Sequence, residues 1–352
     1  MKARAVEVRT ALLAPAAALL VALLAFHLLV LLYGESPARV LRVMLEGTWG
    51  NPYGLGQVLF KATPLIFTGL AVAIPFRAGL FNIGAEGQVV IGALTGALIG
   101  TALPAGSPWI LAIPLVAAGA ALAGGAWGAV PGALKARFGA HEVITTIMLN
   151  FVALALVNYL VASHFHVSET LHTEPIVEGA RLSRLGAWIP ALHGSAASSA
   201  LLWALVGSAL AAWLLFRTPL GYEIRAVGLS RGAAEYGGIS VLRVSTLSMA
   251  IGGACAGLVG VNFVQGYKYY FEDGFSGGVG FMGIAVALLG RNHPLGIVLA
   301  ALLFGTLSQG GLVINALVPK EIVEILQAVI ILAVVVASRE VRAVLMRSGG
   351  GR

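Results

Sequence analysis

One polar stretch, punctuated by glycines, lies between two apolar runs of this sequence. Residues 76–88 read Phe-Arg-Ala-Gly-Leu-Phe-Asn-Ile-Gly-Ala-Glu-Gly-Gln. The glycines permit the backbone to leave a helix, while Asn82, Glu86 and Gln88 can hydrogen-bond a polar solute and Phe81 can stack on it. The composition predicts a solute-binding segment. An ordinary cytoplasmic turn between two membrane spans explains the same residues, and both interpretations stay open.

A second group of polar and aromatic residues lies inside apolar runs. Asn150 follows Thr145 and Thr146, and an amide in lipid needs a partner, so we expect an interhelical hydrogen bond or a place on the solute pathway. Asn262 and Gln265 are weaker candidates of the same kind, and Phe281 offers a second aromatic face. The predicted pathway residues are Phe81, Asn82, Glu86, Gln88, Asn150 and Phe281.

Residues that could power transport are scarce. No lysine follows a glycine, which excludes the Gly-Lys-Ser/Thr phosphate-binding loop, so ATP would have to be hydrolysed by another subunit. Asp273 is the single aspartate, which leaves an aspartyl-phosphate pump almost nothing to use. An ion-coupled transporter would depend on Glu86 or Glu142, and both can equally sit at helix ends in the headgroup region.

Catalytic and metal chemistry are also poorly supported. The residue types that bind metals gather once, at His164, His166, His172, Glu169 and Glu174. Their spacing matches no standard zinc site, so we expect a solvated loop. We predict no catalytic residue, no metal site and no cofactor, although zinc at this cluster remains the alternative.

The elements that position these residues must lie in lipid. Hydrophobic residues make up 59% of the 352 positions and charged residues 11%, too few to cover a soluble domain with polar groups. Gly92, Gly96 and Gly100 recur every fourth residue, as do three glycines from Gly124 to Gly132, and each set can form a close helix-packing face. We predict an all-α, polytopic membrane helix bundle, one transmembrane domain over residues 1–352.

About ten spans fit the roughly 20 residues needed to cross a bilayer. They are predicted at 11–33, 62–76, 87–104, 108–134, 143–162, 198–216, 244–264, 279–290, 295–318 and 322–337. Lys and Arg are more numerous in every second connection, which predicts that both termini are cytoplasmic. Residues 163–197 then form an external loop and 217–243 a cytoplasmic loop. This topology, not nucleic-acid binding, explains the net charge of +7.

The second and eighth of these runs are too short to cross the membrane alone. Short segments interrupted by Gly or Pro are the best pointer to a transporter's binding site, because unwound backbone at membrane depth survives only where it lines a cavity. The two runs also share a pattern, Gly-Leu-Ala-Val-Ala-Ile-Pro-Phe-Arg at 69–77 and Gly-Ile-Ala-Val-Ala-Leu-Leu-Gly-Arg at 283–291. Coincidence explains the pattern as well as an internal repeat does.

Residues 76–88 resemble the permeases of bacterial nucleoside importers of the ABC class, which belong with sugar and branched-chain amino acid permeases. Further matching motifs are His-Glu-Val-Ile-Thr-Thr-Ile-Met-Leu-Asn at 141–150 and Gly-Phe-Met-Gly-Ile-Ala-Val-Ala-Leu-Leu-Gly-Arg-Asn-His-Pro at 280–294. The resemblance covers roughly residues 60–315. Gly232, Gly237 and Gly238 depart from the family pattern and put the helix boundaries there in doubt.

The resemblance implies a transport subunit, not an enzyme, in a bacterial inner membrane. It implies a cytoplasmic ABC ATPase, a second permease that is a copy or a paralogue, and an extracytoplasmic solute-binding protein. Nucleosides are the leading substrate, with simple sugars and riboflavin as alternatives. A secondary transporter driven by an ion gradient is the rival from another class.

The cytoplasmic loop carries the expected coupling element. Ser230 can cap a short helix that Gly237 and Gly238 end. In resembling permeases a short helix here fits a groove on the ATPase. The predicted coupling residues are Gly228, Ser230, Ala233, Ala234, Glu235 and Tyr236. A solvated linker is the alternative, since loops tolerate substitution.

Overall fold

The computed structural model describes residues 20–333, which belong to two compact units. One unit is Leu59–Leu302, and the other combines 20–58 with 303–333. Helices α3 (Pro52–Arg77) and α12 (Pro294–Ile314) pass from one unit into the other. A single transmembrane domain over 1–352 stays a prediction.

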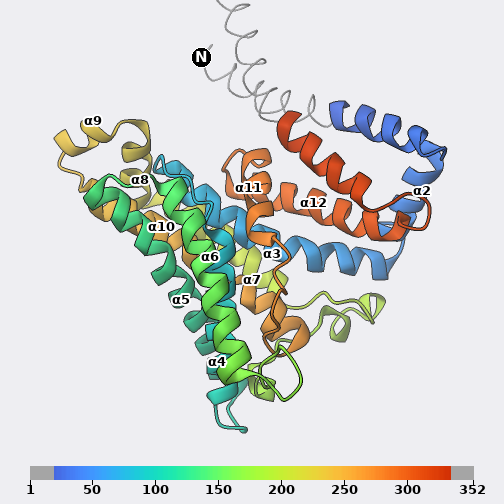
Figure 1. Ribbon diagram of the computed structural model, residues 1–352, viewed down its shortest axis with the longest axis horizontal. Helices are drawn as coiled ribbons and strands as arrows, with labels where there is room; N and C mark the ends of the chain where they lie inside the picture. The colour runs from blue at the N-terminus through green and yellow to red at the C-terminus, as the bar shows by residue number, and fades with distance from the viewer. Residues whose placement is uncertain (1–19, 334–352) are drawn as a thin grey trace, which may run out of the picture. The chain divides into compact units, whose positions relative to one another are not determined.

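The regular secondary structure of the larger unit is helical, which confirms the predicted all-α class (Figure 1). Within the described residues, β-structure is limited to isolated bridges such as the one between His166 and Thr173. Besides the parts of α3 and α12, the α-helices of this unit are α4 (Ala85–Ala102), α5 (Trp109–Phe138), α6 (Glu142–Leu160), α7 (Ala200–Arg217), α8 (Pro219–Leu229), α9 (Arg231–Tyr236), α10 (Val241–Gly257) and α11 (Val279–Leu289).

Seven helices in the described part of the chain are long and apolar enough to cross a membrane, or eight if one bent pair counts as a span. They correspond to the predicted spans two to seven and nine, so the chain is a multi-pass membrane protein. The predicted eighth span is only the 11-residue helix α11. The first and tenth predicted spans lie partly outside the described residues.

The prediction that the second span is a short, interrupted run is wrong. Helix α3 is continuous over 26 residues and includes Pro64 and Pro75. Its apolar sequence begins at Pro52, and Lys61 is the one charge before its last residue. Because Lys61 interrupts the uncharged run, the predicted span began at residue 62 and omitted the first ten residues of the helix, 52–61.

The predicted glycine faces are confirmed where α4, α5 and α10 pack together. A Cβ on Gly128 would come within 2.6 Å of the Met249 carbonyl oxygen, and one on Gly132 would come within 3.0 Å of that of Ser245. A Cβ on Gly92 would come closer still to the Gly257 backbone. Because these contacts join backbone to backbone, any side chain there would separate the helices. The order of contacts also shows that α5 and α10 run antiparallel.

Large apolar side chains on the outward faces of α5, α6 and α7 are exposed, as lipid-facing residues are. Leu122, Phe151 and Trp213 are 74%, 65% and 59% exposed. Basic residues gather at one end of the unit, because α3, α5 and α7 all end there and α10 begins there: Arg77, Lys135, Arg137, Arg217 and Arg243. This basic end is the cytoplasmic one by the expected topology.

In the smaller unit, a helix at Leu20–Leu32 and α2 (Pro37–Thr48) meet at a bend of 113°. Trp49 Nε1 donates a hydrogen bond of 3.1 Å to Thr306 Oγ1, which fixes α2 against the last turns of α12. Gly310 leaves room for the Met44 side chain at this contact. Another helix follows at 321–333.

Candidate functional site

Residues 78–84, between α3 and α4, are not helical and fold back beside α3. Asn82 is fully buried, and its Nδ2 donates a hydrogen bond of 3.0 Å to the carbonyl oxygen of Ala71. Ala71 precedes the end of α3 by about six residues, or ~9 Å of helix. Helix α4 therefore begins inside the helix bundle.

Two amide side chains close this returning segment on itself. Asn82 Nδ2 donates to Gln88 Oε1 at 2.9 Å, and Gln88 Nε2 donates to Asn82 Oδ1 at 3.0 Å. The Asn82 oxygen also accepts the backbone N–H of Gly84. Since both residues are buried, the pair satisfies polar groups that would otherwise be costly in an apolar interior.

Asn150, on α6, links the segment to a neighbouring helix. Its Oδ1 accepts the Gly87 N–H at 2.8 Å, and its Nδ2 donates to the Ile83 carbonyl oxygen at 2.9 Å. The predicted interhelical hydrogen bond is confirmed.

Glu86 joins the start of α4 to the start of α11. Its buried carboxylate accepts the backbone N–H of Gly278 at 3.2 Å and that of Gly280 at 2.7 Å. The first N–H groups of a helix have no partner within the helix and carry a partial positive charge, so a carboxylate stabilises them. Gly280 has no room for a Cβ beside Glu86. Helix α11 is thus a half-helix that begins inside the bundle.

The structure brings together four of the six predicted pathway residues, which we call the buried network: Asn82, Glu86, Gln88 and Asn150. All four are hydrogen-bonded to protein groups, so in this state they hold the helix break and do not offer free groups to a solute. Phe81 lies at its edge and meets Phe76 edge to face, with centroids 6.1 Å apart. Phe281 is 47% exposed on α11.

A π-helical stretch follows α10, at Val261–Lys268, and only a weak signal in the sequence points to it. Asn262 and Gln265 in this stretch are buried, and the side-chain carbonyl oxygen of each lacks a hydrogen-bond partner. The Phe60 ring packs edge to face on Phe263, with centroids 5.8 Å apart. Two amides three residues apart, flanked by aromatics in an apolar run, were the available signal. π-Bulges are frequent at functional sites.

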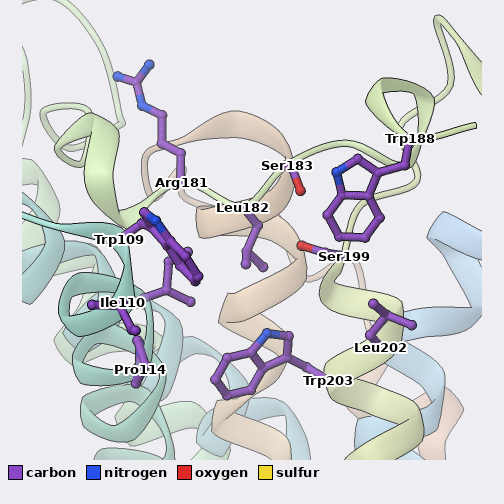
Figure 2. A pocket seen from close by; sticks show the side chains of 11 residues that line it. Trp109, Ile110, Pro114, Arg181, Leu182, Ser183, Trp188, Ser199, Leu202 and Trp203 are labelled. Carbon is purple, nitrogen blue, oxygen red and sulfur yellow. The ribbon is translucent and has the colours of Figure 1, made fainter.

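A pocket of about 490 Å³ opens at the end opposite the basic end. The start of α5, the loop before α7 and the start of α7 form it. Figure 2 shows Trp109, Trp188 and Trp203 on three sides of the pocket. Arg181 also lines the pocket, and its guanidinium carbon lies 4.9 Å from the Tyr269 ring centroid. Tryptophans in this setting are typical of the membrane–water interface.

The histidines of the same loop do not converge. His172 stacks on Tyr270, with centroids 4.4 Å apart, whereas His164 contacts Tyr159. Within residues 20–333, no group of three or more His, Cys, Asp or Glu is arranged to hold a metal ion.

Helices α8 and α9 lie at the basic end, in the segment that is expected to be cytoplasmic (Figure 1). Ser230 Oγ accepts the Ala233 N–H at 3.4 Å, and α9 ends before Gly238, whose φ is +84°, so the predicted cap and stop are confirmed. Ala233, Glu235 and Tyr236 are exposed, Tyr236 to 98%.

Two of the predicted coupling residues lie elsewhere than on the outer face of α9. Ala234 is only 4% exposed, so its methyl group packs inward and a larger side chain there would disturb folding before docking. Gly228 approaches the Arg77 backbone so closely that a Cβ would overlap it. It allows α8 to pack on the end of α3.

A family model for the permease component of branched-chain amino acid transport systems matches residues 54–335. The chain is 40% identical to the guanosine ABC transporter permease protein NupP of Bacillus subtilis, over 92% of each chain. It is 36% identical to the nucleoside ABC transporter permease protein NupB of Lactococcus lactis, over 92% of this chain and 90% of that one.

A third relative carries a different substrate in its name. The chain is 36% identical to the glucose ABC transporter permease protein TsgB13 of Haloferax volcanii, over 84% of this chain and 80% of that one. No solved structure matches the chain.

Proposed function

The chain belongs to the family of permease components of branched-chain amino acid transport systems, and from that premise we propose that it is the membrane-spanning subunit of an ATP-driven ABC importer for nucleosides. The 40% identity to a guanosine permease over nearly the whole chain is the observation that supports nucleosides as the substrate class. The chain is a transport component in this proposal, and ATP is hydrolysed by a separate cytoplasmic subunit.

The break between α3 and α4 supports a transport role. Non-helical backbone at membrane depth is tolerated where protein buries it or where it lines a cavity, and in transporters such breaks surround the binding site. We place the solute pathway beside this break, where the buried network fixes its shape. Phe81, Phe281 and the amides of Asn262 and Gln265 are the groups left to meet the solute.

An ion-coupled mechanism has less support, because both candidate carboxylates are engaged. Glu86 binds two backbone N–H groups of α11, and Glu142 forms an ion pair of 2.9 Å with Lys135 at the junction of α5 and α6. A coupling residue must exchange its proton with the pathway. Neither group is placed for that in this state.

The partners follow from the same proposal. The exposed face of α9 docks on the ATPase, a second permease subunit completes the pathway, and an extracytoplasmic binding protein delivers solute at the tryptophan-lined end. The complex resides in a bacterial inner membrane.

Competition for uptake tests the substrate class. In the reconstituted complex, we expect unlabelled nucleosides to suppress uptake of a labelled nucleoside, with ribose, glucose and amino acids having no effect. Suppression by glucose or ribose alone would establish the second candidate, a simple-sugar importer, which the identity to the Haloferax glucose permease favours.

Substitution at the break tests the pathway. Asn82→Ala removes the bonds that hold residues 78–84 against α3, each worth about 1 to 3 kcal/mol when buried. We expect roughly tenfold or greater loss of uptake at unchanged ATPase binding. Wild-type uptake would contradict the pathway assignment.

A further inference from the structure

A second pocket, of about 360 Å³, lies at the basic end of the larger unit. The residues that line this arginine pocket include Phe76, Arg77, Arg225, Leu229, Arg291 and Asn292. It lies where α3 ends and α12 begins, beside the last residues of α8. Because α3 and α12 are membrane-spanning helices, their ends lie at the level of the lipid headgroups.

Three guanidinium groups converge on this pocket, and no acidic residue is among the described residues that line it. The Arg77 and Arg225 guanidinium carbons lie 5.7 and 5.6 Å from the Phe216 ring centroid, so one ring holds both charges. Arg77 also donates two hydrogen bonds to the Asn292 carbonyl oxygen, at 2.9 and 3.1 Å. Like charges this close repel, and the partial negative charges at the helix ends offset only part of that repulsion.

Two polar atoms of the pocket residues are buried without a partner. Nη1 of Arg225 is a donor that lacks an acceptor. Oδ1 of Asn292 is an acceptor that lacks a donor, on a side chain that is only 8% exposed. Buried polar groups are nearly always hydrogen-bonded, so the pocket suits a ligand that supplies an acceptor for Arg225, such as an anionic oxygen, and a donor for Asn292, such as a hydroxyl.

We propose that the arginine pocket binds a glycerophosphate group, with its phosphate on Arg225 and Arg291 and a glycerol hydroxyl on Asn292. Guanidinium groups match phosphate oxygens in charge and geometry. A protein carboxylate would satisfy the arginines but has no hydroxyl for Asn292, and it is small for the volume of the pocket.

The group has two sources, an anionic phospholipid such as phosphatidylglycerol or a soluble glycerol phosphate. The rim is suited to the lipid, because Phe76 and Leu229 are 41% and 89% exposed there. Basic pockets between helices on the cytoplasmic side are a recurrent form of lipid recognition.

The test uses the full chain in detergent, and the variants Arg225→Gln and Arg291→Gln with Arg243→Gln as control. Arg243 is exposed at the same end of the unit and does not line the pocket. Native mass spectrometry measures retention of phosphatidylglycerol against phosphatidylcholine. Thermal unfolding in the presence of glycerol 3-phosphate or inorganic phosphate tests the soluble source.

Selective retention of phosphatidylglycerol by wild type and control, with about tenfold weaker binding in each pocket variant, supports a lipid ligand. Stabilisation by glycerol 3-phosphate that the pocket variants lose supports the soluble source. The proposal is overturned if neither ligand distinguishes the pocket variants from the control. In that case, loss of co-purification with the ATPase subunit in the pocket variants, measured separately in the complex, would assign the pocket to a protein carboxylate.

Discussion

In the buried network, the side-chain amides and the carboxylate each meet a partner within the protein, whereas the arginine pocket combines three cations with polar atoms that lack one. Asn82 bonds the Ala71 carbonyl oxygen within α3 and the Gly84 N–H before α4, and Glu86 bonds two backbone N–H groups at the start of α11. Nη1 of Arg225 and Oδ1 of Asn292 form no such bond. Substitution should therefore damage folding and transport together in the first region, and ligand binding alone in the second.

The most severe test of this contrast is Glu86→Ala. The substitution leaves the backbone N–H groups of Gly278 and Gly280, at the start of α11, without an acceptor, at a cost of about 3 kcal/mol or more. We expect a markedly lower melting temperature of the purified chain and loss of uptake. In Glu86→Gln one oxygen can still accept from Gly280, so an intermediate result is expected. Unchanged stability in Glu86→Ala would show that the carboxylate does not hold α11.

Asn150→Ala should have the next largest effect. It removes the acceptor of the Gly87 N–H and the donor to the Ile83 carbonyl oxygen, and each loss costs about 1 to 3 kcal/mol. The matched control is Asn158→Ala on the same helix, where the exposed amide donates to Asp273. Thermal unfolding and uptake should both separate the two variants. Equal results would contradict a structural role for Asn150.

Local features of these regions could be predicted from the sequence. Ser230 was identified as a cap and Gly238 as a stop because capping depends on a few neighbouring residues. The partner of Asn150 could be expected because an unpaired amide is costly in lipid. The close packing at Gly124 and Gly132 could be predicted because a glycine recurs there at every fourth residue.

Features that depend on distant residues could not be predicted. The hydrogen bond from Asn82 to Ala71 forms because the chain turns back beside α3. The hydrogen bond between Glu86 and Gly280 joins two helices that are far apart in the sequence. The sequence places Arg77 and Arg291 at the ends of two similar runs and on the same side of the membrane, but it does not show that they line one pocket. The inward direction of Ala234 follows from how α9 packs, which a run of small residues does not reveal.

The exposed face of α9 tests whether a region without internal partners can be changed without harm to the fold. Tyr236 is 98% exposed. Tyr236→Ala should therefore change the free energy of unfolding by no more than about 0.5 kcal/mol and leave the melting temperature close to that of wild type. We expect weaker co-purification of the ATPase and lost solute-stimulated hydrolysis. Tyr222→Ala on α8, 63% exposed, is the control. Full retention of the ATPase in Tyr236→Ala would place the coupling surface elsewhere.

The smallest expected effect is a pH dependence at the edge of the arginine pocket. His293 stacks on Phe216, with centroids 5.3 Å apart. Partial burial, and then the nearby Arg77 charge, lower the pKa of His293 below its usual 6.5. The unfolded chain therefore binds a proton more readily than the folded one as the pH falls through 6.5, so this residue favours unfolding increasingly until the pH reaches its folded pKa. Melting temperatures between pH 7.5 and 5.5 should fall less steeply in His293→Gln than in wild type. Glycerol 3-phosphate should also reduce the slope of melting temperature against pH in wild type, because an anion in the pocket offsets the charge of Arg77. Identical slopes for wild type and His293→Gln would exclude His293 as a source of this pH dependence.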